Sequence, residues 1–416
     1  MKEKMYILGG EKVCNKEFEK WPTYRPEYLA GVEKVLKSGW WGGIRDDSEV
    51  AEFEKRFATY IGVEYAIGVS SGSVALVMAL KSLNLKSGTE VIVPGMSFVA
   101  TATAVSILGL IPVFVDIDPK THCILAKEIE NNISQKTRVI IPVHIGGYPC
   151  DMERIMKIAK NNNLYVIEDC CQAHGAEWNG KKVGSYGDIG VFSFASTKNM
   201  TSGEGGILLT NKEKIYKKLR SLRNHGRINS MDYYHERLGL NFRMNEFQAK
   251  LLDMQLDLLD EQLRIKNRNV EYLVSKIKKL SYKWIEFLEY RKEVTVHAFF
   301  SFAFLYKPSF FEDIPKEFMC KIIRSEGIPV GEASIADRAI FDNPIYTDFS
   351  NEDYCLSKKG ECKNTVKAYQ EVIVLGQSVR SAILLGDYEE MDYIINVIKK
   401  ININKKEISI YYKNQK

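Results

Sequence analysis

A carboxylate and an amine stand close to the ends of two apolar segments in the middle of the chain. The first segment, 164–169, ends in Glu168 and Asp169, and the second, 190–194, is followed by Lys198. Each segment is short and apolar, which is typical of a buried β-strand. In a mostly parallel sheet the carboxyl ends of the strands open into one crevice, where ligands bind. The sequence therefore predicts that Asp169 and Lys198 reach the same site.

A serine- and glycine-rich helix start adds a candidate anion site. The run Ser70-Ser71-Gly72-Ser73 follows an apolar strand and precedes a helical pattern. The first amides of a helix lack intrahelical acceptors and lie at the positive end of its dipole, so a phosphate suits them. Ser193 lies at a strand end between two bulky neighbours and is expected to donate to the same anion. Taken alone, such a start is also an ordinary N-cap.

Together these groups fit pyridoxal 5′-phosphate. That cofactor needs a lysine to hold its aldehyde as a Schiff base and an acidic partner for its pyridine nitrogen. Gly203, Gly205 and Gly206 beyond Lys198 indicate a tight turn close to the ligand. Taken alone, Asp169 would be interpreted as an ordinary helix cap and Lys198 as a surface lysine. Their joint occurrence with a phosphate site favours the cofactor.

Composition narrows the class of protein. The chain has 416 residues, 45% of them apolar, and a net charge of +5 without a basic arm, so it predicts large buried cores and no nucleic-acid partner. No apolar run reaches the roughly 18 residues that span a bilayer, and the start lacks an apolar signal core. A cytoplasmic protein is expected. The eight cysteines are irregularly spaced and predict reduced, packed thiols, with no metal site.

Strand-like and helix-like segments alternate between about residues 60 and 210. This alternation predicts an α/β fold with a mostly parallel seven-stranded sheet between helices. Helical spacing is clear over 73–83 and 151–161. The strands are expected at 65–69, 90–94, 112–116, 138–144, 164–169, 190–194 and 206–210.

A long amphipathic stretch over 245–279 contains neither Gly nor Pro and predicts one helix that joins two domains. We expect a large cofactor-binding domain with an N-terminal arm over 1–250. The linking helix and a small C-terminal α+β domain occupy 251–416. In the latter the pattern predicts a strand at 295–306, helices at 315–326 and 389–400, and a frayed tail after Ile401.

Several motifs together carry a resemblance to a known family. They are Gly72-Ser73, Ser97-Phe98-Val99-Ala100-Thr101, Val143-His144, Glu168-Asp169, Gln172-Ala173-His174-Gly175, Phe194 through Lys198, Gly203-Glu204-Gly205-Gly206 and Asn241-Phe242-Arg243-Met244. Over about residues 21–399 the chain resembles the DegT/DnrJ/EryC1/StrS aminotransferases, the sugar and cyclitol branch of the fold type I pyridoxal phosphate enzymes. The resemblance implies that fold type and that cofactor.

The resemblance also implies residue roles. Lys198 is the Schiff-base lysine and Asp169 the partner of the pyridine nitrogen. Catalytic work is assigned to Lys198, Asp169 and His174, although a histidine beside a strand end is often a packed structural residue. The remaining cofactor contacts are Phe98 on the ring, Gln172 near the ring hydroxyl, Gly72, Ser73, Val74 and Ser193 on the phosphate, and Asn241 from the neighbouring chain. That last contact implies a homodimer with shared active sites.

The implied reaction moves an amino group from glutamate or glutamine to a keto sugar or keto cyclitol by a ping-pong mechanism. The freed lysine amine would shuttle the proton. Such enzymes serve sugar or aminocyclitol pathways that lead to antibiotics or surface polysaccharides. The alternative is a dehydratase or aromatising lyase on a cyclic keto polyol. The family's sugar dehydratases typically carry histidine in place of the lysine, so Lys198 favours amino transfer; a cofactor-holding regulatory protein is a third reading.

Three segments point to one branch of the family. Residues 21–24, 38–43 and 382–386 look like the glutamine:scyllo-inosose aminotransferases and the 3-amino-5-hydroxybenzoate synthases. Trp40 and Trp41 would form a substrate wall lent by the partner chain, or an ordinary packed pair. Residues 376–380 depart from this branch, which usually carries paired histidines there. The departure predicts a changed substrate pocket.

Overall fold

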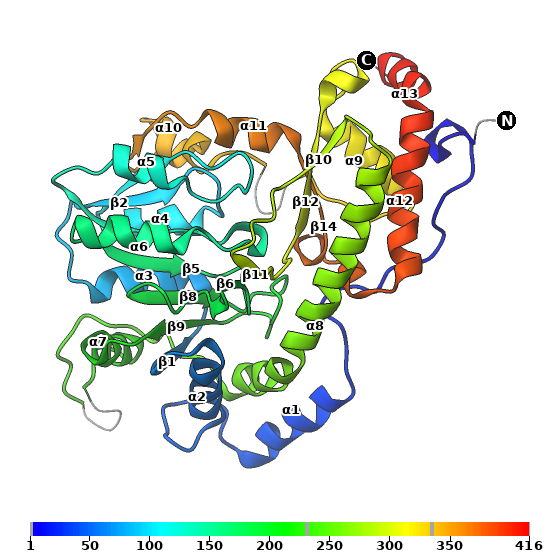
Figure 1. Ribbon diagram of the computed structural model, residues 1–416. Coiled ribbons are helices and arrows are strands. Elements are labelled where there is room, and N and C mark those ends of the chain that lie inside the picture. The colour runs from blue at the N-terminus through cyan, green and yellow to red at the C-terminus, as the bar shows by residue number, and fades with distance from the viewer. Residues whose placement is uncertain (1–2, 229–232, 333–336, 416) are drawn as a thin grey trace.

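The computed structural model describes residues 3–228, 233–332 and 337–415, and a large central sheet dominates it (Figure 1). The strand order is β1-β9-β8-β5-β4-β2-β3-β13. β9 runs antiparallel to both of its neighbours, and the other pairs are parallel. The strands are β1 Tyr65–Val69, β2 Glu90–Pro94, β3 Ile111–Val115, β4 Thr137–Ile140, β5 Tyr165–Asp169, β8 Ile189–Ser193, β9 Gly206–Thr210 and β13 Lys358–Lys359.

All seven strands expected from the sequence are present, but the sheet has an eighth. β13 is a two-residue parallel strand beside β3, so the expected count of seven is corrected. It consists of two lysines, which carry no apolar pattern. Lys358 is held there by an ion pair with the buried Glu90 of β2. A contact across 268 positions of sequence is invisible to a local pattern.

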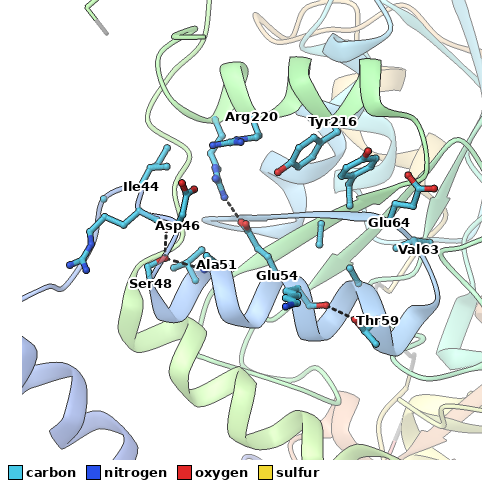
Figure 2. A pocket seen from close by; sticks show the side chains of 18 residues that line it. Ile44, Asp46, Ser48, Ala51, Glu54, Thr59, Val63, Glu64, Tyr216 and Arg220 are labelled. Carbon is cyan, nitrogen blue, oxygen red and sulfur yellow. Dashed lines mark hydrogen bonds and ion pairs between the residues drawn. The ribbon is translucent and has the colours of Figure 1, made fainter. Parts of the chain in front are cut away.

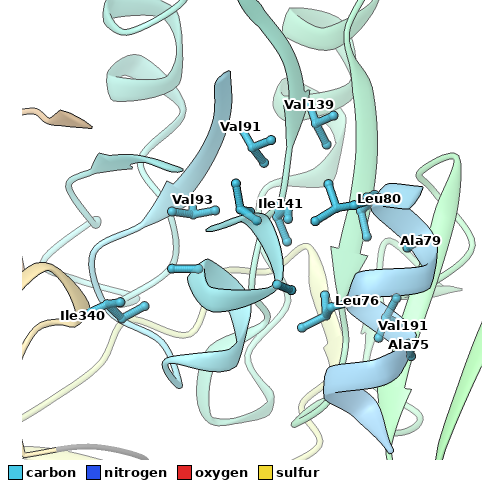
Figure 3. Close-up of a cluster of buried hydrophobic side chains, with 14 of the residues drawn as sticks. Ala75, Leu76, Ala79, Leu80, Val91, Val93, Val139, Ile141, Val191 and Ile340 are labelled. Atoms are coloured by element: carbon cyan, nitrogen blue, oxygen red, sulfur yellow. The ribbon is translucent and has the colours of Figure 1, made fainter. Parts of the chain in front are cut away.

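Helices cover both faces of the sheet because the strand residues alternate. Val91 and Val93 of β2 face one core cluster, and Ile92 faces another. Figure 3 shows the first cluster, where α3 lies against the strands. That face is covered by α3 Gly72–Ser82, α4 Ala100–Ser106 and α7 Glu213–Arg223, and the opposite face by α5 Ala126–Asn131, α6 Met152–Asn161, α2 Glu49–Ile61 and the first half of α8 Glu246–Lys279.

The long helix α8, Glu246–Lys279, forms as the sequence predicts. Asn245 caps it, and Gln248 completes a capping box. Its first half packs beside the central sheet, and its second half contributes Val270, Leu273, Val274 and Ile277 to a separate cluster. The N-terminal residues Met5 and Cys14 belong to that second cluster too. The division at residue 250 stays a prediction.

The second cluster surrounds a three-stranded antiparallel sheet of β10, β12 and β14. The strands are β10 Ile285–Phe287, β12 Phe302–Tyr306 and β14 Val372–Leu375, and the helices packed on them are α9 Lys316–Ser325, α12 Tyr388–Ile403 and α13 Lys405–Lys413. Two helices of the C-terminal segment, α10 Pro344–Thr347 and α11 Lys363–Glu371, instead pack on the first cluster through Tyr346, Ala368 and Tyr369. The remaining elements are α1 Glu27–Ser38 and a small sheet of β6 Glu177–Trp178, β7 Lys181–Lys182 and β11 Val294–Val296. Short 3-10 helices lie at Tyr6–Leu8, Ile145–Gly147, Pro308–Phe311, Ile340–Asp342, Gln377–Val379 and Ile383–Leu385.

Two expectations for the C-terminal part are wrong. The strand expected at 295–306 is two strands in different sheets, because the backbone turns at Phe299, where φ is 41°. The tail after Ile401 is not frayed but continues into α13, whose Ile408 is fully buried. Asn404 donates to the backbone oxygen of Glu3, so both ends of the chain lie at one end of the molecule (Figure 1). Among the described residues, no helix combines the length and apolar character that a membrane crossing requires.

Candidate active site

A cavity of about 540 Å³ opens where β1, β2, β5 and β8 end. This volume falls within the range of roughly 300–1,000 Å³ that small-molecule sites occupy. Asp169 and Lys198 both line it, so the structure brings the predicted carboxylate and amine to one place. Of the ten predicted site residues, the cavity is lined by seven: Gly72, Ser73, Phe98, Asp169, Gln172, Ser193 and Lys198.

Asp169 is buried at the end of β5 with both carboxylate oxygens held. Thr101 Oγ1 donates to Oδ2 over 2.9 Å, and the amide of Cys171 donates to Oδ1 over 3.2 Å. Ser97 Oγ lies 2.8 Å from Thr101 Oγ1 and extends this chain of hydroxyl groups. Because a carboxylate oxygen accepts more than one hydrogen bond, Asp169 can still accept a hydrogen bond from a donor in the cavity.

Glu168, the neighbouring acid, points away from the cavity because side chains alternate along a strand. Its oxygens accept the amides of Gly184, Tyr186 and Gly187 over 2.7–2.8 Å. His144 accepts the Cys150 amide at Nδ1, so Nε2 carries the hydrogen that faces Glu168 at 3.3 Å. These contacts give Glu168 and His144 a structural role. The atoms of Glu168, His144 and Cys170 that could bind a metal ion nevertheless lie within 4.8 Å of one another.

Lys198 carries its amino group into the cavity. Burial lowers the pKa of this amine, while the nearby Cys171 and Asp169 oppose the shift. Nζ lies 4.4 Å from the ring centroid of Phe300. Trp21 Nε1 donates to the backbone oxygen of Lys198 over 2.9 Å and fixes the turn that carries it. A lowered pKa leaves more of the amine uncharged, and the uncharged amine is the nucleophile.

The opposite end of the cavity is a helix amino terminus. Gly72 begins α3, and a Cβ added to it would lie 2.6 Å from Ser193 Cβ, so only glycine fits there. Ser71 Oγ accepts the amide of Val74 over 3.2 Å. The amide predicted to bind phosphate at Val74 is therefore already paired, and Val74 does not line the cavity. The first-turn amides of Gly72 and Ser73 have no intrahelical acceptor.

Gln172 and Phe98 form the sides of the cavity between these two ends. Gln172 is buried, and its Oε1 accepts the amide of Gly146 over 2.8 Å, so its position is fixed. Phe98 remains 49% exposed. A large apolar ring with an open face can stack on a flat ligand.

Besides Val74, two predicted site residues lie outside this cavity. His174 is fully buried between Phe192 and Phe194, with ring centroids 5.3 and 5.6 Å away. Burial and then the charge of Lys198 lower its pKa to about 3, so its ring is uncharged at neutral pH. Asn241 is exposed and does not line the cavity of its own chain. This position leaves it available to a neighbouring chain.

The cavity also has walls that sequence reasoning did not assign. Thr101 and Ser97 stand in a quoted motif, but only the structure shows their contact with Asp169. Phe300 and Ser378 come from the C-terminal part of the chain, more than 100 positions after Lys198. No local pattern signals such a contact. The unassigned lining residues are Ser71, Leu76, Ser97, Ala100, Thr101, Cys171, Ala195, Thr197, Glu204, Phe300 and Ser378.

A second hollow of about 420 Å³ lies between α2 and α7 and shares no residue with the first. Figure 2 shows Glu54 of α2 opposite Tyr216 and Arg220 of α7. Glu54 pairs with Arg223, and Tyr216 stacks on Tyr65 at 4.4 Å between ring centroids. None of the predicted site residues lines this hollow, so the candidate chemistry belongs to the first cavity.

Comparison with known proteins identifies relatives over nearly the whole chain. The model of the DegT/DnrJ/EryC1/StrS aminotransferase family matches residues 22–398. An L-glutamine:2-deoxy-scyllo-inosose aminotransferase of Streptomyces fradiae is 32% identical over 95% of this chain and 96% of its own length. A GDP-perosamine synthase of Escherichia coli O157:H7 is 40% identical over 58% of this chain and 66% of its own length.

A solved structure gives the same assignment. The crystal structure of a 3-amino-5-hydroxybenzoic acid synthase superposes with a TM-score of 0.81 and 27% identity, over 92% of this chain and 99% of that one. The fold expected from the sequence and the resemblance to this family are both confirmed.

Proposed function

Because the chain belongs to the DegT/DnrJ/EryC1/StrS aminotransferase family, we propose that it transfers an amino group from glutamate or glutamine to a keto cyclitol or keto sugar. We propose pyridoxal 5′-phosphate as its cofactor. The single observation that carries both is the cavity, in which a held carboxylate, a buried amine and a helix amino terminus converge.

The residues of the cavity fit that cofactor. Asp169 would hold a proton on the pyridine nitrogen, and the amides of Gly72 and Ser73 with the Ser193 hydroxyl would bind the phosphate. The cradle at Gly72 is so tight that a Cβ would meet Ser193, which is the close backbone approach that a phosphate needs. When bound, the cofactor supplies an aldehyde that takes up an amine and a ring that withdraws electrons.

Lys198 would hold the cofactor covalently through Nζ until an amino donor displaces it. The freed Nζ amine would then serve as the base that takes up, and later gives back, the proton of the donor's α-carbon. Its lowered pKa suits this task, since a base must be uncharged to accept a proton near neutral pH. Trp21 and Phe300 keep the amine in place.

We also propose a homodimer in which the partner subunit's Asn241 completes the phosphate site. Asn241 is exposed in its own chain. Large apolar side chains are exposed on the N-terminal segments and on the loop before Asn241, as expected of a surface that a second copy covers. These residues are Tyr24, Leu29, Leu36, Trp40, Trp41, Leu238 and Leu240.

A cyclic polyol ketone is the preferred acceptor. The Streptomyces fradiae relative named for such a ketone matches along nearly its whole length, whereas the GDP-perosamine synthase matches over 58% of this chain. The runner-up function is an aromatising lyase, because the 3-amino-5-hydroxybenzoic acid synthase shares the fold. Loss of water from the ketone without transfer of an amino group, detected by mass spectrometry of the products, would favour the lyase.

The proposal is tested with purified protein and added cofactor. The wild type should absorb visible light and bleach when glutamine or glutamate is added, and Lys198→Ala should do neither. The bleached form, incubated with a panel of keto cyclitols and keto sugars, should regain its colour with the true acceptor. A wild type that stays colourless with the cofactor contradicts the proposed function.

A further inference from the structure

Lys266 of α8 is a buried lysine whose hydrogen-bond partners in the described part of the chain include no acid. It is 1% exposed. Its Nζ donates to Asn199 Oδ1 over 3.2 Å and to Gln377 Oε1 over 2.5 Å. Burial lowers the pKa of its amine to about 7. Burying an amine costs free energy that an apolar residue of the same size would avoid. The presence of a lysine at this buried position therefore needs an explanation.

The two amides held by Lys266 sit next to residues that line the active-site cavity. Asn199 follows Lys198, and its Nδ2 donates to the backbone oxygen of Ala298 over 2.8 Å. Gln377 precedes Ser378. Because an ammonium group only donates, both amides must turn their oxygens toward it. Lys266 therefore fixes the orientation of two segments of the cavity wall at once.

Ser378 brings an unpaired hydroxyl to this wall. Its Oγ is buried and has no hydrogen-bond partner among the described residues. Its amide donates to the backbone oxygen of Phe300 over 3.3 Å, and the ring of Phe300 lies 4.4 Å from Lys198 Nζ. Buried polar atoms without a partner are rare in folded proteins, and a hydroxyl that lines a ligand cavity finds its partner in the ligand.

We propose that Lys266 is a positioning residue that acts through Gln377, and that Ser378 Oγ hydrogen-bonds an oxygen of the keto acceptor. The inference rests on the proposed function and deepens it, because it names the group that recognises a polyhydroxylated ketone. Ser378 belongs to 376–380, the segment that departs from the resembling branch. In this segment the hydroxyl of Ser378 would thus bind the substrate where the branch usually carries paired histidines.

The test separates the two half-reactions by following the visible absorbance of the cofactor, with glutamine as donor and scyllo-inosose or 2-deoxy-scyllo-inosose as acceptor. Ser378→Ala and Lys266→Met should each lower kcat/KM for the acceptor about tenfold, the effect of one lost hydrogen bond. Bleaching of Ser378→Ala by glutamine should stay within about twofold of the wild type. Equal losses in both half-reactions of Ser378→Ala would overturn the inference.

A double variant distinguishes positioning from a general structural defect. If Lys266 acts through Gln377 on the position of Ser378, Lys266→Met with Ser378→Ala should be no slower toward the acceptor than the slower single variant. Multiplying losses, about a hundredfold in all, would overturn the inference. Two matched controls should match the wild type: Lys316→Met, a buried lysine that donates to the backbone of Glu332, and Ser381→Ala, whose Oγ accepts the amide of Ile383.

Crystal structures of the wild type and Lys266→Met with bound cofactor give a readout that needs no turnover. The Gln377 amide should leave its position and the Ser378 hydroxyl should turn away from the cavity. Unchanged positions of both side chains would overturn the inference. A wild type that fails to bleach with any donor would instead contradict the proposed function, so the two failures are distinguishable.

Discussion

Thr101 Oγ1 donates a 2.9 Å hydrogen bond to Oδ2 of Asp169. Thr101 comes from α4 and Asp169 from the end of β5, so the contact joins a helix on one face of the sheet to the edge where the cavity opens. Both side chains are buried, and Ser97 supports the hydroxyl from 2.8 Å away. A carboxylate held this way is oriented before any ligand arrives.

Thr101→Val tests this support. Valine keeps the shape and removes the donor, so Asp169 loses a hydrogen bond to its charged form, worth about 1.5–3 kcal/mol. We expect the affinity for pyridoxal phosphate to fall by about tenfold or more, measured by titrating the cofactor-free protein and following absorbance.

Thr103→Val is the matched control. Thr103 lies on the same helix, but its hydroxyl donates to the backbone oxygen of Val99 and does not touch Asp169. Its cofactor affinity should equal that of the wild type. Equal affinities for Thr101→Val and the wild type would show that Asp169 needs no support from the hydroxyl.

The parts of this site that the sequence predicts are those encoded within one strand and its following turn. Asp169 ends an apolar strand, Lys198 follows another, and Gly72 opens a helix, so local pattern and spacing place all three. The long helix α8 was also predictable, because its cap at Asn245 and its apolar stripe lie in one continuous segment.

The remainder depends on contacts between distant segments. Phe300 and Ser378 reach the cavity from the C-terminal part, and β13 joins the sheet through Lys358 and Glu90. Lys266 reads in the sequence as one of many lysines on the polar face of α8, yet it is buried against Gln377. Tertiary packing decides these positions, and a single sequence does not contain that information in any local window.

Gly72→Ala tests the end of the cavity where we propose that the phosphate binds. The added Cβ would lie 2.6 Å from Ser193 Cβ, so the start of α3 or the end of β8 must shift. We expect a loss of about 1–3 kcal/mol in the free energy of unfolding, the usual cost of overpacking, and weaker cofactor binding. Urea unfolding and cofactor titration measure the two effects.

Gly42→Ala is the control for that change. A Cβ at Gly42 meets nothing within 4 Å in the described part of the chain. Its unfolding free energy should stay within about 0.5 kcal/mol of the wild type. If Gly72→Ala behaves like Gly42→Ala, the close approach of Gly72 and Ser193 is not a constraint on the site.

His174→Leu decides between a catalytic and a packed histidine. The ring is uncharged, lies between two phenylalanines and has no hydrogen-bond partner among the described residues. We therefore expect the free energy of unfolding to change by less than about 1.5 kcal/mol and kcat to stay within about threefold. A general acid or base would instead lose about 10²–10⁴-fold in kcat, which steady-state kinetics would reveal at once.

The buried amine of Lys266 makes stability depend on pH. Its pKa is about 7 in the folded protein and 10.5 ordinarily. Between these values the unfolded chain binds more protons than the folded one, so the free energy of unfolding rises with pH, by at most about 1.4 kcal/mol per unit. Below about pH 7 both states hold the proton, and the cost of burying the charge is present in full.

Lys266→Met removes this dependence. The free energy of unfolding of the variant minus that of the wild type should be highest at and below pH 7 and should fall steadily toward pH 10. The oxygens of Asn199 and Gln377 lose their donor in the variant, which lowers this difference by the same amount at every pH. Urea unfolding of the cofactor-free proteins at pH 7, 8, 9 and 10 measures the trend, with Lys127→Met at an exposed position of α5 as baseline. A difference that is the same at all four pH values would mean that the amine keeps its charge in the fold without penalty, and the burial argument for Lys266 would fail with it.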